Sequence, residues 1–407
     1  MKMIYTGLSL DTDSSKAGRE AARTAAGKFG TDDSVSWVLA FCGGRHQPEV
    51  ILDGIRSELG NIPIYGGAAV GLITNETLGN TGYECGLAVF SAAFPEHGSI
   101  VADNLQSGEF QAGTDLGRKL SKAAIDGDSV VIFYDNLRST PPPLLYSGSK
   151  LMNGLYEGLA GKQLHIFGAG MVGDFTFSPS FIFDGTNAVK HSAIAVILPR
   201  ALSPHTKIMH GCTPISSFME ITKIEGAVLY ELDGRRATDV FSKMLGIDEE
   251  FLRDDDIPFL VTLGQKQGDP FAPFSEDLYV NRLIINSDPK TGTITLFESD
   301  FQQGSKIQIM SRDTRIMVDS VKKQTRHLLS SISTDDAEFA FYIDCAGRAS
   351  RFCGSETEEA GVATEEIGNL IPFLGFYSGV EIAPFFGRSR PLDWTGVLTV
   401  FTRKNQY

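Results

Sequence analysis

Three glycines follow an apolar run at the spacing of a nucleotide-binding turn. Gly168, Gly170 and Gly173 form the pattern G-x-G-x-x-G, which in dinucleotide-binding proteins precedes a helix whose N-terminus binds a pyrophosphate. The residues that follow, DFTFSPSFIF (174–183), alternate, are aromatic and contain a proline. They predict strands around a turn rather than a helix. We therefore expect the glycines to let two strands, or a strand and a ligand, approach closely.

A cysteine or an aspartate precedes an arginine by three residues at the end of three apolar runs. The pairs are Cys42 with Arg45, Asp135 with Arg138, and Cys345 with Arg348. Next to a thiol, an arginine can bind a carboxylate ligand through two parallel hydrogen bonds or lower the pKa of the thiol. The alternative is structural, with a small core cysteine and an arginine that binds turn carbonyls.

Two further charged residues stand in apolar surroundings. Arg282 lies in the run YVNRLIIN (279–286), and Glu381 follows a glycine-rich bend. A buried arginine requires a partner, which is either an internal acid such as Glu381 or an acidic ligand. We expect both residues at a ligand site.

Other catalytic signatures are missing from the sequence. The histidines are scattered, and neither H-E-x-x-H nor G-x-S-x-G occurs, so we expect no metal site and no serine nucleophile elbow. A thiol-dependent enzyme that uses Cys345 or Cys42 remains an alternative.

The elements that must position these residues repeat along the chain. Each copy has a strand and polar turn, then a helix, a glycine-rich bend and a final strand. The strand-and-turn segments are 35–45, 129–138 and 338–348, the bends 62–71, 164–173 and 371–380, and the final strands 86–90, 193–198 and 397–401. The bends place Gly66, Gly67, Gly168, Gly170 and Gly375 among the expected ligand contacts. Aligning the three arginines makes Cys42, Asp135 and Cys345 equivalent. The fold class expected is α/β, with mixed β-sheets layered with helices and internally repeated β-α-β-β units.

Apolar periodicity also predicts where the helices lie. The expected helices are 15–29 (capped by Ser14 or Ser15), 48–59, 113–125, 144–160, 235–246 and 313–331. Strands are expected over 206–233 and 258–311, and the charged run 247–256 is expected to be a solvated loop or short helix.

Charge and cysteine content limit the function classes. The formal net charge is −14, from 50 acids and 36 bases, which disfavours nucleic acid and anionic membranes as partners. No apolar stretch approaches a transmembrane length, and the start of the chain does not resemble a signal peptide. Five cysteines without a C-x-x-C pair indicate reduced thiols, so we expect a cytoplasmic protein.

Several motifs, taken in order, resemble the FIST family. They are FGAGMVGD (167–174), MHGCTPISSFMEITKIEGAVLYELDGRRATDVF (209–241), YVNRLII (279–285), CAGR (345–348) and PFLGFYSGVEIAP (372–384). The resemblance implies a FIST N-like domain at 1–205, a FIST C-like domain at 206–407, and an intracellular sensory module that binds a small ligand. Val380-Glu381 and Asp393-Trp394-Thr395 depart from the family pattern.

The same resemblance raises the question of haem, because some members are implied to be haem-binding nitric-oxide sensors that act on a histidine kinase. Candidate axial ligands are His210, Cys212 and His46. No cofactor is expected, and haem is the alternative.

The sequence thus predicts a sensor without catalysis. Its ligand would be a small polar or carboxylate-containing molecule held where glycine bends and arginine turns meet, and its output would pass through a histidine kinase or another signalling protein.

Overall fold

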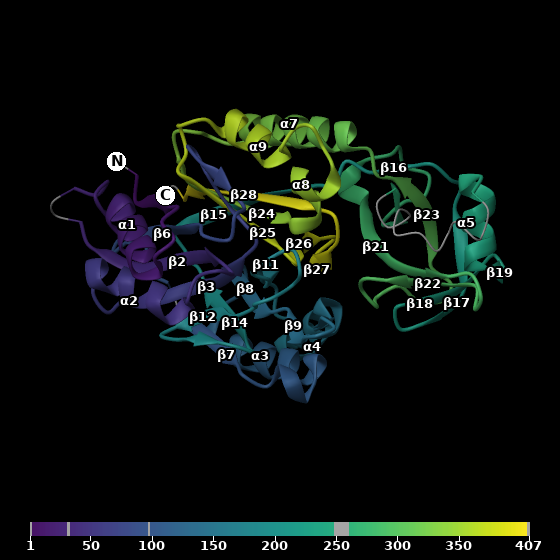
Figure 1. Cartoon of the computed structure of the whole chain (residues 1–407), viewed down its shortest axis with the longest axis horizontal. Coiled ribbons are helices and arrows are strands. Elements are labelled where there is room, and N and C mark those ends of the chain that lie inside the picture. Colours follow the sequence, from purple (N-terminus) through teal and green to yellow (C-terminus); the bar gives the residue numbers. More distant parts are fainter. Residues whose placement is uncertain (1, 31–32, 97, 248–259, 405–407) are drawn as a thin grey trace.

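The computed structural model describes residues 2–30, 33–96, 98–247 and 260–404. Most of the predicted charged run 247–256 therefore lies outside the described residues. What is described forms an α/β structure of mixed sheets covered by helices, as predicted (Figure 1).

Three units with one element order make up most of the chain. Each unit runs strand, helix, strand, helix, strand, hairpin, strand. Apart from its hairpin, the first unit contains β1 (Ile4–Ser9), α1 (Ser14–Ala26), β2 (Val35–Gly43), α2 (Pro48–Leu59), β3 (Ile64–Ala69) and β6 (Cys85–Ser91). The second unit contains β7 (Gly98–Ala102), α3 (Glu109–Ala123), β8 (Ser129–Asp135), α4 (Gly148–Leu159), β11 (His165–Met171) and β14 (Ala193–Ile197). The third unit contains β15 (Leu202–Met209), α7 (Thr314–Ser330), β24 (Ala337–Cys345), α9 (Glu359–Ile367), β25 (Phe373–Ser378) and β28 (Gly396–Arg403). The predicted threefold repeat is confirmed.

Each unit gives its hairpin to the sheet of another unit. The hairpins are β4–β5 (Leu72–Thr74, Leu78–Gly79), β12–β13 (Ile182–Gly185, Ala188–Val189) and β26–β27 (Val380–Phe385, Arg388–Leu392). The resulting six-stranded sheets have the orders β1-β6-β2-β3-β12-β13, β7-β14-β8-β11-β26-β27 and β15-β28-β24-β25-β4-β5. The exchange is cyclic, so it ties the N-terminal and C-terminal halves of the chain together. The predicted domain boundary at 205/206 falls inside β15.

The three sheets pack their inner faces against one another. Phe41 from the first unit lies at their meeting point, with ring centroids 5.4 Å from Phe133, 5.9 Å from Phe341 and 4.2 Å from Phe376. All four rings are buried, and burying one such ring contributes about 3 kcal/mol. The helix pairs α1/α2, α3/α4 and α7/α9 cover the outer faces on three sides (Figure 1).

A fourth sheet is inserted between β15 and α7. It belongs to a small domain that lies to one side of the three units (Figure 1) and has its own apolar core. Its elements are β16 (Thr213–Pro214), β17 (Met219–Glu225), β18 (Val228–Leu232), β19 (Arg235–Arg236), α5 (Ala237–Leu245), β20 (Val261–Lys266), η3 (Glu276–Leu278), β21 (Tyr279–Asp288), β22 (Thr293–Leu296) and β23 (Lys306–Ser311). The remaining short elements are η1 (Leu105–Ser107), β9 (Leu137–Ser139), β10 (Leu144–Leu145), η4 (Ala346–Arg348) and α8 (Ser350–Cys353).

Local sequence explains most helix boundaries. Helix α2 begins at Pro48, which suits a first helical turn, and Gly60 follows its end with φ 78°. The cap of α1 was predicted wrongly. Asp13, not Ser14 or Ser15, accepts a hydrogen bond from the backbone N–H of Lys16 at 2.8 Å.

Across the part of the chain that the structure describes, no helix combines the length and the apolar character needed to cross a membrane.

Candidate functional site

A cavity of about 400 Å³ lies where β24 and β25 end, between the turn that follows β11 and the inserted domain. Its walls are mostly apolar and aromatic, with a few polar groups. The lining residues are Val172, Asp174, Phe175, Phe177, Leu283, Ile284, Ile285, Phe297, Arg312, Cys345, Ala346, Gly347, Phe352, Ser378, Gly379 and Trp394. Volume and lining are typical of a small-molecule site.

The cavity carries one strong cationic group on its wall. Arg312 follows β23 directly, and its guanidinium carbon lies 3.4 Å from the ring centroid of Trp394. Burial lowers the pKa of Arg312 to about 10, so the group is still charged at neutral pH. A cation stacked on an indole and held away from water attracts an anionic ligand more strongly than an exposed one does.

Two aromatic side chains form part of the cavity wall on another side. The rings of Phe175 and Phe352 are stacked with centroids 5.8 Å apart. Phe352 is 44% exposed, although large apolar side chains are usually buried. An apolar ligand that contacted these rings would remove them from water.

The strand ends contribute Cys345 and Ser378, which are paired in the parallel register of β24 and β25. The Ser378 hydroxyl lies 2.8 Å from Glu381 Oε1 and 3.2 Å from the Asp344 carbonyl oxygen, and either oxygen can accept its hydrogen. Burial raises the pKa of the Cys345 thiol and that of Glu381 well above their usual values. The Cys345 thiol is therefore neutral near pH 7 and poorly suited to act as a nucleophile.

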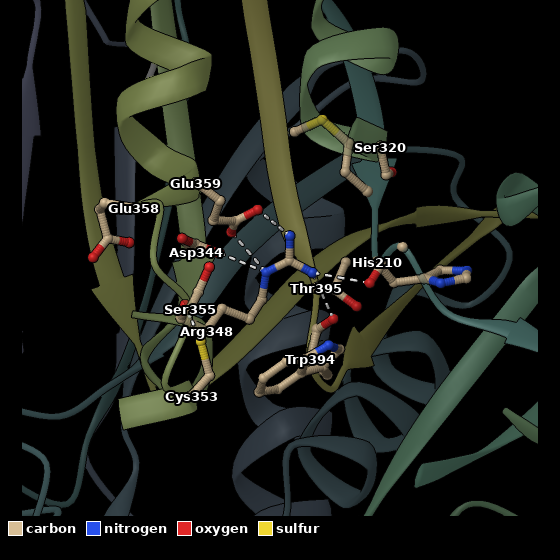
Figure 2. Close-up of polar contacts among 12 residues, drawn as sticks. His210, Ser320, Asp344, Arg348, Cys353, Ser355, Glu358, Glu359, Trp394 and Thr395 are labelled. Carbon is tan, nitrogen blue, oxygen red and sulfur yellow. Dashed lines mark hydrogen bonds and ion pairs between the residues drawn. The ribbon is translucent and has the colours of Figure 1, made fainter. Parts of the chain in front are cut away.

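Arg348 does not face the cavity as a ligand donor. Its Nε donates to Glu359 Oε1 at 2.7 Å and lies 3.2 Å from Asp344 Oδ1, and its Nη2 pairs with the second Glu359 oxygen (Figure 2). Its Nη1 donates to the carbonyl oxygens of His210 and Trp394 at 3.2 and 3.0 Å. The guanidinium is fully buried, and all these partners lie within the protein. Arg348 therefore joins α9 and β24 to the turns that contain His210 and Trp394.

Arg282 is likewise held by internal acids. Its Nε and Nη2 donate to Asp300 at 2.7 and 2.6 Å, and its Nη1 lies 3.5 Å from Asp393 Oδ1. The predicted need for an acidic partner is met, but by Asp300 and Asp393 rather than by Glu381.

The first two copies of the predicted pair lie away from the cavity wall. Arg45 is exposed, with its guanidinium carbon 5.2 Å from the ring centroid of Tyr83, and Arg138 is exposed on β9. Asp135 is buried, and it accepts hydrogen bonds from the backbone N–H groups of Leu137 and His191 at 3.0 and 2.5 Å.

The predicted equivalence of Cys42 with Asp135 and Cys345 is wrong by one residue. The equivalent residues are Gly43, Asp135 and Cys345, because their backbone N–H groups make the same hydrogen bond. They donate to the backbone carbonyl oxygens of Glu84, Ser192 and Thr395, at 2.9, 2.9 and 3.2 Å respectively. Cys42 instead packs toward α1 and α2. Because side chains alternate along a strand, a shift of one residue moves a side chain to the other face.

The glycine-rich bends do meet across the repeats. The N–H of Gly379 donates to the Gly170 carbonyl, and that of Gly44 donates to the Gly173 carbonyl, both at 2.9 Å. Gly168 lies within β11, where a Cβ would stand 1.9 Å from the Ile132 carbonyl oxygen. The chain then continues through a turn to β12 and not into a helix, so these glycines serve close strand packing, as expected.

The other glycines have the same role. Gly66 and Gly375 occupy the position of Gly168 in their own sheets, opposite the Ala40 and Tyr342 carbonyl oxygens. A Cβ on Gly67 would lie 2.4 Å from the Phe181 carbonyl oxygen. None of these residues belongs to the cavity wall.

The proposed haem ligands do not fit an axial role. His210 Nδ1 accepts from the Cys212 N–H at 2.9 Å, and its Nε2 lies 3.2 Å from the Glu276 carbonyl oxygen. His46 Nδ1 lies 3.1 Å from the Ser14 hydroxyl, and its Nε2 2.8 Å from the Tyr83 carbonyl oxygen. Both rings use both nitrogens inside the protein, and burial raises the pKa of Cys212 to about 11. An absorption spectrum after haem addition tests whether haem binds at all.

Sequence reasoning missed the residues that shape the cavity. Arg312, Phe175 and Phe352 were not candidates, and Trp394 was noted only as a departure from the family pattern. A usable signal existed for Arg312, which directly follows the apolar run KIQIMS (306–311). The aromatic residues gave none, because their meeting depends on segments far apart in sequence.

Comparisons with known proteins agree with the predicted family. Residues 36–235 match the model of the FIST N domain, and residues 237–384 match that of the FIST C domain. An uncharacterized protein of Mycobacterium tuberculosis, MT0656, is 22% identical over 98% of this chain and 99% of its own length. Mb0898c of Mycobacterium bovis, also uncharacterized, is 27% identical over 48% of this chain, and the match spans 49% of that relative's length.

Two solved structures were also found. They are a chorismatase, with 7% identity over 98% of both chains, and a cyanuric acid hydrolase from A. caulinodans, with 10% identity over 100% of both. The TM-score is 0.33 in each case, which is too low to support an argument about this chain.

Proposed function

Because this chain belongs to the FIST family, whose domains are associated with signal transduction and small-ligand sensing, we propose that its cavity of about 400 Å³ is the sensory site. The ligand is a small molecule with a flat apolar or aromatic body and one carboxylate. The observation that carries the proposal is the Arg312 guanidinium stacked on Trp394 within an otherwise apolar wall.

The chemistry of the wall supports one charge on the ligand and not several. Phe175, Phe297, Phe352 and Trp394 offer apolar surface, which contributes to affinity by its removal from water. Arg312 offers a planar donor suited to a carboxylate. The acidic side chain on the wall, Asp174, uses Oδ1 to accept from the Thr176 and Ser178 N–H groups at 2.8 and 3.0 Å, so it shapes its own turn.

A signal would arise because the wall comes from separate parts of the fold. Leu283, Phe297 and Arg312 belong to the inserted domain, whereas Cys345 and Phe175 belong to the repeats. A ligand that contacts both favours the arrangement in which they are closest, and this differential binding shifts the population. We propose that a partner, either a histidine kinase or another signalling protein, reads this shift, and that the site itself is not catalytic.

Tryptophan fluorescence can test the proposal directly. The chain has two tryptophans, Trp37 and Trp394; Trp37 is stacked on Phe90 in the core, so Trp37→Phe leaves Trp394 as the reporter. Benzoate and phenylacetate are titrated against the neutral benzyl alcohol. We expect saturable changes in Trp394 emission, with the carboxylates bound about tenfold or more tightly than the alcohol.

Matched variants separate binding from loss of folding. Arg312→Gln should remove the preference for carboxylates while benzyl alcohol still binds, and Arg312→Lys should restore part of it. Trp394→Phe, with Trp37 retained, should lose the emission response. The proposal fails if Trp394 emission responds to none of the probes at millimolar concentrations, or if Arg312→Gln keeps the same carboxylate preference. Native mass spectrometry of the purified protein would identify a retained ligand.

A further inference from the structure

A second, polar pocket of about 130 Å³ lies between α4 and β27. Helix α4 comes from the second repeat, β27 is the edge strand contributed by the third, and residues 300 and 302 belong to the inserted domain. In contrast to the aromatic cavity, its lining is mainly polar. The polar side chains are Ser149, Asn153, Asp300, Gln302, Arg388, Ser389 and Arg390.

Two arginines on one strand define the chemistry of this pocket. Arg388 and Arg390 are two residues apart on β27, so they lie on the same face of the sheet. Arg388 donates to Asn153 Oδ1 at 2.7 Å, and its guanidinium carbon lies 4.5 Å from the ring centroid of Tyr156. The Asn153 amide group, whose oxygen is occupied, is therefore left with its N–H donors for another partner.

Arg390 is half-buried, and within the described part of the chain its side chain makes no ion pair and donates no hydrogen bond. Burial lowers its pKa, with Asp300 acting in the opposite direction. A partly buried guanidinium without a bonded counter-ion is costly. An anion in the pocket would supply one.

Asp300, the acidic residue that lines the pocket, is already paired with a cation. Both carboxylate oxygens of Asp300 accept from Arg282, at 2.7 and 2.6 Å, and Arg282 keeps the pKa of Asp300 below its usual value. Below Ser149, the buried Glu298 accepts from the Gly148 and Ser149 N–H groups at 2.9 and 3.1 Å. The lining thus presents two cations against one acid that is already paired, in a chain with a net charge of −14.

We propose that this pocket binds a phosphate group, either inorganic phosphate or the phosphate of a phosphomonoester. Arg388 and Arg390 would bind its oxygens, and the amides of Asn153 and Gln302 would complete the donor set. A volume of about 130 Å³ is several times what one ordered water molecule requires, so it leaves room for a tetrahedral oxyanion. The site is separate from the aromatic cavity, so the proposal is independent of the proposed sensory function.

Isothermal titration with inorganic phosphate, at ionic strength matched with sodium chloride, tests the site. Wild type should bind phosphate saturably, and Arg390→Gln should weaken binding by about tenfold or more, since a charge-assisted contact is lost. Arg388→Gln should weaken it less, because this side chain is exposed. Arg138→Gln, which removes an exposed arginine on β9 in the same repeat as α4, should change nothing.

The remaining arms decide the ligand class. Acetate should bind much more weakly than phosphate. Glycerol phosphate that binds more tightly than phosphate points to a phosphomonoester, and equal binding points to free phosphate. Any one of three results would overturn the proposal: no saturable binding of phosphate to wild type, unchanged phosphate affinity in Arg390→Gln, or acetate binding as tight as that of phosphate. Near-UV circular dichroism and the response of Trp394 to benzoate should stay unchanged in Arg390→Gln, so that neither unfolding nor failure of the sensory site is mistaken for loss of this one.

Discussion

The ends of β2 and β24 occupy the same place in their sheets but meet different surroundings. In the first repeat, a Cβ on Gly43 would lie 2.3 Å from the Gly82 backbone and one on Gly44 2.7 Å from the Gly173 carbonyl oxygen. In the third repeat, the nearest atom to a Cβ on Gly347 is 3.5 Å away, in the Trp394 ring, and Cys345 lines the cavity. We call the turn that directly follows β2, or its equivalent strand β24, the corner of its repeat. The corner of the first repeat is therefore closed by backbone, and that of the third repeat is open.

The insertion explains the difference. β1 and α1 are joined by a short connection, whereas β15 and α7 are separated by the whole inserted domain, whose Leu283, Phe297 and Arg312 form one cavity wall. The corner of the third repeat thus faces the inserted domain instead of a neighbouring turn. A repeated fold can supply equivalent corners, and an insertion next to one of them can convert that corner into a binding site.

The largest expected difference between repeats concerns the corner arginines. Arg138 and Arg348 both lie three residues after equivalent strand ends, but Arg138 is exposed and Arg348 is fully buried. Arg348→Met leaves Glu359 and Asp344 buried without their cation, so it should lower the free energy of unfolding by about 3–5 kcal/mol. Arg138→Met should change it by less than about 0.5 kcal/mol. Urea unfolding followed by circular dichroism measures both, and equal effects would contradict the assigned roles.

The glycines at equivalent positions of β11 and β25 should also differ. A Cβ on Gly168 would stand 1.9 Å from the Ile132 carbonyl oxygen, whereas one on Gly375 would lie 3.0 Å from that of Tyr342. Gly168→Ala should therefore cost about 3 kcal/mol and Gly375→Ala about 1 kcal/mol. The same unfolding experiment ranks them, and a larger loss in Gly375→Ala would show that the packing is described incorrectly.

Stability should depend on pH through a carboxyl beside the third corner. Burial, only partly offset by Arg282, raises the pKa of Asp393 to about 7, from 3.8. The folded protein therefore retains a proton that the unfolded chain loses, so the contribution of Asp393 to stability is fully present below about pH 4 and declines as the pH rises to about 7. Asp393→Asn should weaken this decline by up to about 1.4 kcal/mol per pH unit. Identical slopes for both proteins between pH 4 and 7 would rule out this titration.

The smallest expected effect is a difference in thiol reactivity. Burial raises the pKa of Cys42 and of Cys345, and Cys353, which is only partly buried, is the most accessible of the three. Iodoacetamide at neutral pH should therefore label Cys353 first and Cys345 slowly, as mapped by peptide mass spectrometry with Cys345→Ser as the control. Rapid labelling of Cys345 would instead favour a thiol-dependent activity.

Much of the fold could be predicted because its signals are local. Apolar runs of strand length, glycine bends and capped helices recur three times, so the repeat, the mixed sheets and α2 at 48–59 followed from sequence. The alignment failed at Cys42 because it matched Arg45 with Arg138 and Arg348, whereas backbone pairing makes His46 their equivalent. One residue of offset is invisible in an apolar run, yet it moves a side chain from one face of the sheet to the other.

The sequence by itself determined that Arg282 needs an acidic partner, that the glycines after residue 167 do not begin a helix, and that three similar units exist. Only the tertiary structure decided which acids pair with Arg282 and Arg348, how the hairpins are exchanged, and that Arg312 meets Trp394 at a cavity. The physical reason is distance along the chain. Asp393 pairs with Arg282, which lies 111 positions away in the sequence. Such contacts depend on the packing of whole sheets rather than on the preference of any local segment.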